Sequence, residues 1–536
     1  MRKAIAWLLA LTLPVGLLSG CAETQEDTDT GTEIHLDDAG ITVDGEAIST
    51  EETAAVYTAH DIVYYEDGHD FTYGEGTEAD AHTRAEADAH TVVHITQPGT
   101  YMLDGTLSAG QIAVDLGEDA EEDPEAVVTL ILNGVDITCT VAPAVIFYNV
   151  YECGSTDEDT ATETVDTTAA GANVIIADGT TNHVTGSYVA RIYDPDTVVL
   201  SEDGTEVVEE EKLHKYDGAF YSKMSMNVDG GEEGTGVLNI TADNEGLDTE
   251  LHLTIHGGNI NITSGNDGIN TNEDNVSVTT INGGTLNIQV TGETGEGDGI
   301  DSNGYLVING GTVTAAACST SGDAGIDAST GITINGGTVM ASGNMYDPID
   351  GGDQTYVVFS FASRQTGGET YTLQNADGET VGTWTPANDF IYLAVSSPDL
   401  TAGDYTLWQG DTQQAGSASE GMGGPGAMGG GQPGGGAPPA DGEAPADAPE
   451  LPEGAEPPSG GEVPEGEEPL AGEEPPPDVP ERPEGEEPPA GGRPEDGTQS
   501  AAELSETFPL TEGGNFFTGI APLETTEDTA SDTAET

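Results

Sequence analysis

Acidic side chains recur at one position of a repeated corner in the middle of the chain. At five successive corners, an aspartate or asparagine directly follows an Ile or Leu: Asp248, Asn270, Asp301, Asp327 and Asp350. At three of these corners, another aspartate precedes the glycine or proline: Asp267, Asp298 and Asp347. If the apolar residue of a strand points into a core, its neighbour points outward. We therefore expect two parallel, exposed ladders of oxygen atoms.

These ladders need a counter-charge from solution. Residues 224–353 contain 19 Asp and Glu and no Lys or Arg. Two like charges about 4 Å apart cost roughly 1 kcal/mol even in water, so stacked acids favour a bound cation. Calcium prefers oxygen ligands and accepts carboxylates mixed with Asn side chains, so we predict that these eight residues bind calcium. The alternative is that the acids form a solvated face or cap turns.

The corners belong to an internal repeat. Double glycines end at Gly258, Gly284, Gly311 and Gly337, at spacings of 26, 27 and 26 residues. Each unit contains three short apolar stretches that alternate with polar residues, a pattern typical of strands. Such units bury their apolar faces only when they stack, so that each strand pairs with its counterpart in the next unit. The sequence therefore predicts an all-β fold, a parallel β-helix with glycine pairs at its corners.

Changes in composition define the other parts of the chain. Residues 354–410 lack the repeat but alternate like strands, whereas the Gly, Pro and Glu of residues 411–503 cannot bury a core. We expect the following order: a signal peptide (1–21), a tether and N-terminal cap (22–90), the β-helix (91–353), a small β capping module (354–410), a disordered linker (411–503), an apolar segment that folds back onto the body (504–523) and an acidic tail (524–536).

The first residues predict export. Arg2 and Lys3 precede an apolar run that ends in Leu18-Ser19-Gly20-Cys21. This run is too short to span a membrane, and its ending resembles the cleavage site of bacterial lipoproteins. We expect Cys21 to be lipidated, and the mature protein to be extracellular and anchored to the cell membrane by this lipid. The other cysteines, Cys139, Cys153 and Cys318, leave both a Cys139–Cys153 disulfide and buried free thiols open.

The charge of the chain excludes one class of partner. Its 10 Lys and Arg face 99 Asp and Glu, which gives a formal net charge of −89. Nucleic acids and anionic lipid head groups need a basic surface, so neither is an expected partner. Cations, and ligands that are neutral or bridged by cations, remain.

A series of motifs occurs in order along the chain. They are Ile95–Asp115 (ITQPGTYMLDGTLSAGQIAVD), Val128–Ile137 (VTLILNGVDI), Ile175–Asn182 (IIADGTTN), Asp217–Lys223 (DGAFYSK), the DGI and NGG rungs, and Ser505–Ala521 (SETFPLTEGGNFFTGIA). Together they resemble the clostridial family of extracellular carbohydrate-binding β-helix proteins. The resemblance implies a right-handed parallel β-helix, bound calcium and recognition of cellulose or acidic sugars. The chain departs from the family pattern where Met224 and Ser225 follow Lys223, and at Asp248-Thr249-Glu250.

These observations predict a surface-tethered, calcium-stabilised lipoprotein that binds plant-type polysaccharide, cellulose or polyuronate-like, without catalysis. Tyr305 and Tyr346 on the rungs are the expected sugar contacts, with turn packing as their alternative role. A polysaccharide lyase or hydrolase on the same scaffold is the alternative function. A lyase needs a Lys or Arg base, and only Lys223, Lys215 and Arg191 lie near the repeat. A non-glycan adhesin or spacer is the third hypothesis. The oligomeric state is unknown from the sequence.

Overall fold

The described part of the chain is all-β. A computed structural model of the protein describes residues 31–419 and 504–523. Their helical elements are one α-helix, α1 (Arg84–Ala87), and two 3-10 helices, η1 (Glu118–Glu122) and η2 (Glu158–Thr160). Within these ranges, no helix has the length and apolar character needed to cross a membrane. The expected lipidation site at Cys21, the acidic tail and almost all of the expected linker lie outside the described residues.

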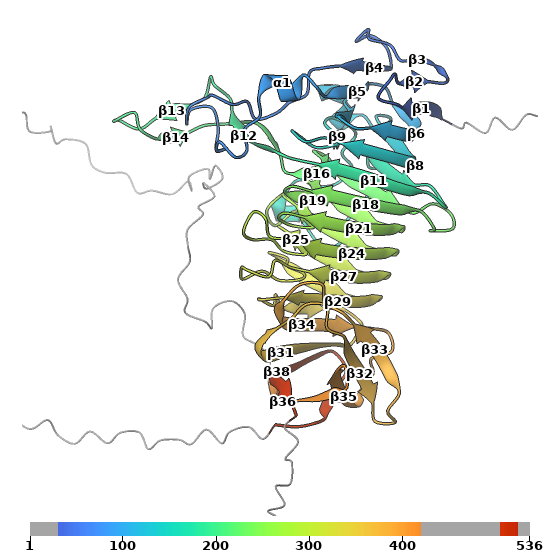
Figure 1. Ribbon diagram of the computed structural model, residues 1–536, viewed down its shortest axis with the longest axis vertical. Helices are drawn as coiled ribbons and strands as arrows, with labels where there is room; N and C mark the ends of the chain where they lie inside the picture. Colours follow the sequence, from blue (N-terminus) through green and yellow to red (C-terminus); the bar gives the residue numbers. More distant parts are fainter. Residues whose placement is uncertain (1–30, 420–503, 524–536) are drawn as a thin grey trace, which may run out of the picture. The chain divides into compact units, whose positions relative to one another are not determined.

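Strands from successive turns of the chain pair in parallel and form a first ladder (Figure 1). Its members are β1 (Thr32–Leu36), β6 (Gly99–Leu107), β8 (Val128–Thr138), β11 (Thr181–Gly186), β18 (Val237–Ala242), β21 (Asn259–Ser264), β24 (Thr285–Val290), β27 (Thr312–Ala316) and β29 (Thr338–Gly343). The ladder reaches further towards the N-terminus than the repeat indicates, because β1 already pairs with β6. The short hairpin of β2 (Thr42–Val43) and β3 (Glu46–Ala47) adjoins β1.

Two further ladders complete each turn. The second ladder runs through β4 (Val56–Ala59), β5 (Thr91–Ile95), β7 (Gly110–Val114), β9 (Val145–Phe147), β16 (Gly218–Ser222), β19 (Glu245–Thr249), β22 (Ile269–Thr271) and β25 (Ile300–Ser302). The third ladder joins the first through the long strand β8 and continues through β10 (Ala172–Ile176), β17 (Met226–Asp229), β20 (Leu253–Ile255), β23 (Val278–Ile281), β26 (Tyr305–Ile308), β28 (Gly331–Ile334) and β30 (Ile349–Gly351). One turn therefore consists of three short strands.

Columns of apolar side chains fill the space between the ladders. In the first ladder, Leu238, Ile260, Leu286, Val313 and Val339 occupy equivalent positions of successive strands, and all of them are buried. The residues between them along each strand alternate outward, as the period of two in the sequence requires. Stacking these columns removes from water the apolar surface that a single turn leaves exposed.

The glycine pairs lie where successive turns touch. Gly284 and Gly311 have φ angles of 83° and 80°, in the left-handed region that favours glycine. A Cβ atom added at Gly284 would lie 2.6 Å from the carbonyl oxygen of Gly258 in the preceding turn. Glycine thus recurs at this spacing for two reasons: the backbone angle is positive there, and successive turns approach each other closely.

Two excursions interrupt the turns. One carries the antiparallel pair β12 (Val189–Tyr193) and β15 (Lys212–Tyr216), and between them the hairpin of β13 (Val199–Leu200) and β14 (Val207–Glu209). The other passes along the third ladder, where the Thr167 hydroxyl donates to Oδ1 of Asn227 at 2.7 Å. Part of the third ladder is therefore covered by chain that does not belong to the repeat.

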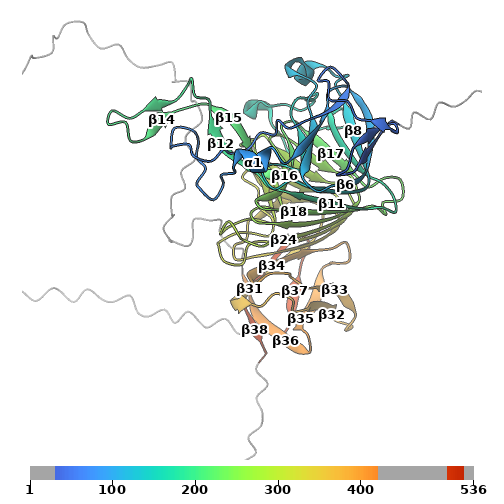
Figure 2. The same ribbon diagram turned by 45° about the horizontal axis from the view of Figure 1, so that its top comes forward.

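A C-terminal module follows the last turn and has its own core (Figures 1 and 2). Its strands are β31 (Tyr356–Gln365), β32 (Tyr371–Asn375), β33 (Thr380–Trp384), β34 (Phe390–Ser396), β35 (Gly403–Gln409), β36 (Thr412–Ser419), β37 (Phe508–Leu510) and β38 (Gly514–Pro522). Strand β34 pairs antiparallel with β29 and so continues the first ladder into the module. The late apolar segment docks on the body, because β38 pairs with both β31 and β36.

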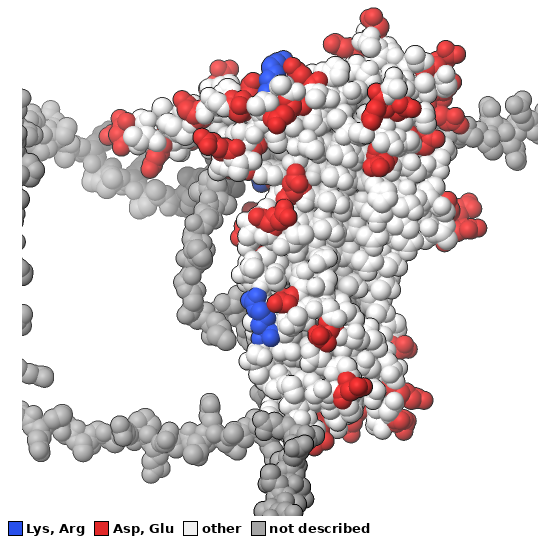
Figure 3. All heavy atoms as spheres, in the orientation of Figure 1, with Lys and Arg blue, Asp and Glu red and all other residues white. Residues whose placement is uncertain are grey.

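Charge is unevenly distributed over the first ladder. In the view of Figure 3, acidic atoms gather along its edges and over the N-terminal and C-terminal parts. The middle of the ladder, from β18 to β27, shows neither acidic nor basic atoms. A chain with a net charge of −89 therefore presents one uncharged face.

Candidate metal centre and the adjoining pocket

The acids that the sequence places at successive corners lie in register in the second ladder. Asp248 of β19 pairs with Asn270 of β22, and Asn270 pairs with Asp301 of β25. The residues before the corner glycines are also adjacent, since the Gly246 amide donates to the Asp267 carbonyl at 3.0 Å. The repeat thus predicts correctly which positions of the chain become neighbours.

The prediction that these side chains are exposed is wrong at β19 and β22. Asp248 is 0% exposed and Asn270 7% exposed. Strand β15 lies beside this region, because Nζ of Lys212 is 3.1 Å from Oε1 of Glu250. Strand β16 packs directly on it, because a Cβ added at Gly218 would lie 2.5 Å from Cβ of Asp248. Asp248 is thus covered both by an excursion strand, β15, and by the preceding turn of the ladder, β16. The position of β15 cannot be read from the 26-residue period.

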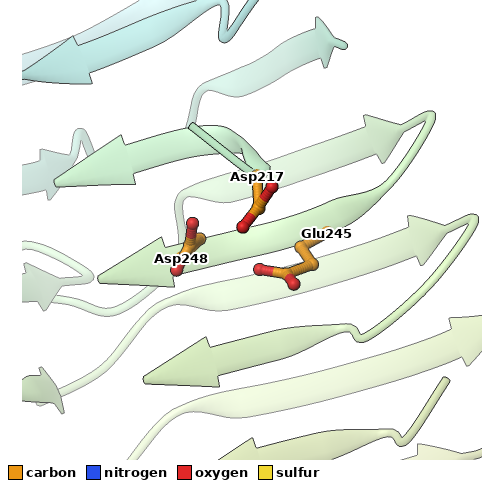
Figure 4. Close-up of side chains that lie close together, drawn as sticks. All are labelled: Asp217, Glu245 and Asp248. Carbon is orange, nitrogen blue, oxygen red and sulfur yellow. The ribbon is translucent and has the colours of Figure 1, made fainter. Parts of the chain in front are cut away.

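Three buried carboxylates converge beneath this cover (Figure 4). Asp217, Glu245 and Asp248 each offer an oxygen atom, and these atoms all lie within 4.8 Å of one another. Asp217 comes from the residue before β16, and the other two come from β19. We call these three residues the acid triad.

Only Asp248 of the acid triad is among the metal ligands that the sequence predicts. Glu245 occupies the same corner position as Asp267 and Asp298, so the repeat itself contained the signal for it. Asp217 directly precedes β16, which pairs in parallel with β19 one turn later, so that Tyr221 lies opposite Asp248. The signal for Asp217 was its place at the start of the DGAFYSK motif.

Several oxygen atoms at the acid triad are buried without a partner. Oε2 of Glu245 and Oδ2 of Asp248 accept no hydrogen bond, and neither does Oδ1 of the adjacent Asn270. The other atoms of these side chains are fixed: Nδ2 of Asn270 donates to Oε1 of Glu245 at 3.1 Å, and Nδ2 of Asn272 donates to Oδ1 of Asp248 at 2.6 Å. A buried oxygen atom without a partner costs free energy, so these oxygen atoms are candidates for binding a cation.

Burial and mutual repulsion also shift the pKa values of the acid triad. Burial, and then the charges of Asp248 and Asp217, raise the pKa of Glu245 well above its ordinary value. Burial, and then the charges of Asp217 and Glu250, raise the pKa of Asp248 well above its ordinary value. Burial also raises the pKa of Asp217, although the charge of Lys215 opposes the increase. Each carboxylate therefore makes ionisation of the others less favourable.

One ammonium group opposes the three acids. Nζ of Lys215 lies 2.7 Å from Oδ2 of Asp217. Burial would lower the pKa of Lys215, but the charge of Asp217 and their hydrogen bond hold it above its ordinary value. If all three carboxylates were ionised, the protonated lysine would leave two negative charges uncompensated in a buried position. A divalent cation would balance them.

The chemistry of the donor set fits a hard cation. Carboxylate oxygens from Asp217, Glu245 and Asp248 and the amide oxygen of Asn270 are the kinds of ligand that calcium and magnesium prefer. The described cysteines, Cys139, Cys153 and Cys318, are free and take no part in this group. The residues present therefore suit calcium better than zinc.

Asp267, Asp298 and Asp301 continue along the second ladder at β22 and β25, and no other group like the acid triad occurs among the described residues. The prediction that Asp350 stacks with these acids is wrong, because Asp350 lies in β30, where Ile349 pairs with Ile332 of the third ladder. Burial, and then the charge of Asp301, raise the pKa of Asp267 to about 8. Burial, and then the charge of Asp327, raise the pKa of Asp301 to about 7 and that of Asp347 to about 7. Burial and the charge of Asp267 raise the pKa of Asp298 well above its ordinary value.

These lower acids also cap backbone amides. Oδ1 of Asp267 accepts from the Asp298 amide at 2.6 Å, and Oδ1 of Asp298 accepts from the Ala324 amide at 2.6 Å. Oδ2 of Asp347 accepts from the Ala328 amide, and Oδ2 of the exposed Asp350 accepts from the Ile332 amide, both at 3.2 Å. Turn capping, the alternative role for these acids, is thus present in the structure.

A pocket of about 930 Å³ adjoins the acid triad. Its lining includes Lys215 itself and all the other lysines of the described residues, Lys212 and Lys223. Nζ of Lys223 pairs with Oε1 of Glu121 at 2.7 Å. The pocket therefore combines the three described lysines with six glutamates that also line it, next to the candidate metal centre.

Three tyrosines form an aromatic cluster in the same pocket. The ring centroid of Tyr216 lies 5.5 Å from that of Tyr148 and 5.1 Å from that of Tyr221, both in edge-to-face contacts. The hydroxyl of Tyr221 donates to Oε1 of Glu250 at 2.7 Å. Aromatic rings next to charged and polar groups can contact both the faces and the hydroxyls of sugars.

The tyrosines that the sequence predicts as sugar contacts lie elsewhere. Tyr305 begins β26 in the third ladder and is half-buried. Tyr346 packs against Phe516 of β38, with ring centroids 5.8 Å apart, and its hydroxyl accepts from the Ile349 amide at 3.1 Å. Tyr346 thus has the packing role that was the alternative to sugar contact. Neither Tyr305 nor Tyr346 lines the pocket that contains Tyr148, Tyr216 and Tyr221, which we call the tyrosine pocket.

The sequence pattern of the carbohydrate-binding domain-containing protein family matches residues 89–377, which is more than half of the chain. The chain belongs to this family. The matched range includes the acid triad, Lys215 and the three tyrosines of the pocket. The family resemblance drawn from the sequence is thereby confirmed at the level of a carbohydrate-binding domain.

Two proteins similar to the chain were found. A carbohydrate-binding domain-containing protein of Acetivibrio thermocellus is 28% identical over 171 residues, which are 32% of this chain and 44% of that protein. The chain thus spans less than half the length of this relative. A solved structure of a polysaccharide lyase-like protein from C. thermocellum, a gadolinium derivative, aligns at 20% identity with 57% of this chain and 92% of that one, with a TM-score of 0.30.

Proposed function

We propose that this carbohydrate-binding domain is a calcium-stabilised receptor for plant-type polysaccharide, cellulose or polyuronate-like, and that it acts by binding without catalysis. Its scaffold in this proposal is a right-handed parallel β-helix. The parallel register of three ladders over successive turns supports this scaffold. Calcium is assigned to the acid triad with Asn270, on the strength of the buried oxygen atoms that lack partners.

The observation that carries the proposal is the position of the tyrosine pocket beside the acid triad. Lys215 belongs to both, because it lines the pocket and pairs with Asp217. Tyr148 is half-buried, whereas Tyr216 and Tyr221 are 9% and 2% exposed, so a sugar in the pocket would meet the exposed edges of this cluster and the polar groups that line the pocket. An acidic sugar would be repelled by a chain of this charge unless a cation lay near it.

The protonation of Lys215 favours binding over catalysis. A lyase needs an unprotonated base to remove a proton from the sugar ring. The charge of Asp217 holds the pKa of Lys215 above its ordinary value, so that the ammonium form dominates at neutral pH. Lys212 and Lys223 are also paired with carboxylates, Glu250 and Glu121.

A lyase is the second candidate, and one observation favours it. If a cation took Asp217 as a ligand, Lys215 would lose its partner within the pocket. Lys215 could then act as a base, and the protein would cleave polygalacturonate and release unsaturated products instead of only binding the polymer. An assay for such products, run beside each binding assay, separates the two candidates.

Binding is tested by retention on polygalacturonate gel and on swollen cellulose, with calcium and with chelator. The informative variant is Tyr216→Ala, with Tyr305→Ala as the matched control outside the pocket. We expect Tyr216→Ala to weaken retention on polygalacturonate about tenfold or more and the control to behave like the native protein. Equal retention of both variants, or no retention of the native protein on any glycan, would contradict the proposal.

We further propose that the protein is held outside the cell by a lipid on Cys21. The apolar run before Leu18-Ser19-Gly20-Cys21 supports this assignment. Incorporation of labelled fatty acid in a bacterial host tests it, with Cys21→Ala as the control. Equal labelling of the two proteins would contradict lipidation without affecting the assignment of the glycan pocket.

A further inference from the structure

Five neighbouring strands of the first ladder contain no ionisable side chain. Strands β18, β21, β24, β27 and β29 read VLNITA, NINITS, TLNIQV, TVTAA and TVMASG. The second ladder differs, since β19 alone contains Glu245 and Asp248. In a chain with a net charge of −89, an uncharged area of this extent is a distinct feature, and it faces the viewer in Figure 3.

The centre of this face is a column of hydrogen-bonded amides. Asn239, Asn261 and Asn287 occupy equivalent positions of β18, β21 and β24. Nδ2 of Asn261 donates to Oδ1 of Asn239 at 3.0 Å, and Nδ2 of Asn287 donates to Oδ1 of Asn261 at 2.9 Å. These bonds fix the side chains before any ligand arrives, which lowers the entropy lost on binding.

Columns of hydroxyl groups flank the amides. Thr285, Thr312 and Thr338 stack on one side, and Thr241 and Thr263 stack on the other. Several of these outward residues are exposed, including Asn287, Thr312 and Thr263. The face therefore offers rows of both donors and acceptors at the spacing of the strands, which is about 4.8 Å.

An aromatic residue closes one end of the face. A pocket of about 200 Å³ is formed by Trp384 of β33 with residues of β27 and β29, among them Thr312, Thr314 and Met340. A Cβ added at Gly382 would lie 2.2 Å from the ring of Trp384, so the glycine leaves room for the ring to lie against the strand. Trp384 packs in the core of the C-terminal module and is 7% exposed, so a sugar ring would meet only the edge of its indole beside the threonine hydroxyls.

We propose that this face is a second glycan-binding surface, which takes an extended, uncharged polysaccharide chain and needs no metal. Sugar hydroxyls both donate and accept hydrogen bonds, as the amide and threonine columns do. A neutral chain brings no charge to be desolvated and no repulsion by the surrounding acids, whereas an acidic polymer brings both. The inference rests on the proposed function only in that the ligand is a polysaccharide, and it assigns a site apart from the tyrosine pocket.

A second asparagine column provides a matched control. Nδ2 of Asn309 donates to Oδ1 of Asn282, and Nδ2 of Asn335 donates to Oδ1 of Asn309, both at 2.9 Å. These residues follow strands of the third ladder and lie outside the proposed face. The double variant Asn261→Ala/Asn287→Ala is therefore compared with Asn309→Ala, and Asn287→Arg places bulk and charge on the face without shortening the side chain.

The test is retention of the full-length protein on swollen cellulose, in calcium and in chelator, below the melting temperature of each variant in chelator. We expect equal retention in both buffers, and about tenfold weaker affinity for the double variant and for Asn287→Arg. Asn309→Ala should bind cellulose like the native protein, and all variants should keep their affinity for polygalacturonate.

The inference would be overturned by native affinity in both face variants, by an equal loss in Asn309→Ala, or by loss of cellulose binding in chelator. A protein retained by polygalacturonate but never by cellulose would also overturn it, while leaving the proposed function intact. A protein retained by neither polymer would overturn both.

Discussion

Nζ of Lys215 lies 2.7 Å from Oδ2 of Asp217, within a group of three buried carboxylates that has no other lysine or arginine partner among the described residues. The ion pair neutralises one of three negative charges. It also places a positive charge where a divalent cation would have to bind, so Lys215 and the proposed calcium ion compete for the same oxygen atom.

Replacing Lys215 should therefore strengthen metal binding. In Lys215→Met, the aliphatic length of the side chain is kept and its charge is removed, so a calcium ion meets no repulsion and Asp217 is unpaired. We expect calcium affinity to rise by about tenfold, because two charges near a protein surface interact by roughly 1 to 4 kcal/mol at such distances. Isothermal titration with calcium measures it. Lys223→Met, which removes a pair with Glu121, is the control; lower affinity in Lys215→Met would contradict the site.

Removing one charge from the acid triad should stabilise the metal-free protein. Asp248→Asn keeps the shape of a side chain that is 0% exposed and ends its repulsion of Asp217. In chelator, we expect the free energy of unfolding to increase by about 1 to 3 kcal/mol, and the stabilisation by calcium to be almost lost. Thermal melting with and without calcium measures both effects.

The exposed Asp350 supplies the control for that substitution. Asp350→Asn removes a predicted ligand that is exposed and lies in β30 of the third ladder, so it should leave the calcium-induced shift of the melting temperature unchanged. A calcium-induced shift of native size in Asp248→Asn would mean that the cation, if bound, lies elsewhere.

The stability of the metal-free protein should fall as the pH rises from about 4 to about 8. The pKa is raised to about 8 for Asp267 and to about 7 for Asp301 and Asp347, mainly by burial. In this range the folded protein holds protons that the unfolded chain, with ordinary carboxyl pKa values, has released. Folding therefore becomes less favourable with increasing pH.

Melting curves in chelator test this dependence. We expect the melting temperature to drop by about 5 °C or more between pH 5 and pH 8. Calcium should reverse the trend, because it binds the ionised carboxylates that predominate at higher pH. A melting temperature in chelator that rises over this range would contradict the burial of these acids.

The repeat made the register of the turns predictable. The spacing of the double glycines and the alternating Ile and Leu positions gave the neighbours of Asp248, namely Asn270 and then Asp301. This worked because each turn satisfies the same local demands, a positive φ at the second glycine and an inward apolar column. The same information is repeated in every unit, so a single sequence is enough to recover it.

The contents of the candidate site were less predictable, because they depend on chain that does not repeat. Asp217 and Tyr216 lie at the end of an excursion, and Tyr148 precedes another. Asp217 stands before β16, one turn ahead of β19, but no period relates Tyr216 to Asp248, and its contacts follow from how the excursion folds over the second ladder. The prediction that Asp248 is exposed failed for the same reason.

The glycine pairs permit a test of contact between turns. Gly284→Ala would place a Cβ 2.6 Å from the carbonyl oxygen of Gly258, at a φ of 83°. Gly378→Ala, in the C-terminal module, has a similar φ of 76° but meets no atom within 4 Å. We expect Gly378→Ala to cost about 1 to 2 kcal/mol, the price of the backbone angle, and Gly284→Ala to cost at least about 1 kcal/mol more. Equal losses of stability in denaturant would mean that the turns do not touch at this corner.

Phe508 provides a test of the docked C-terminal segment. The side chain is 0% exposed, and its ring centroid lies 5.4 Å from that of Phe359 and 4.9 Å from that of Phe517. Phe508→Ala should lower the stability of the C-terminal module by about 3 to 5 kcal/mol, because it leaves a cavity in the module's core. Leu504→Ala, at a side chain that is 58% exposed, should change it by less than about 0.5 kcal/mol.

Hydrogen exchange in β31 and β36, the strands that pair with β38, measures the effect locally. Unchanged protection of these strands in Phe508→Ala would mean that the segment contributes little to the module, whereas faster exchange confined to the module would mean that it folds independently of the ladders.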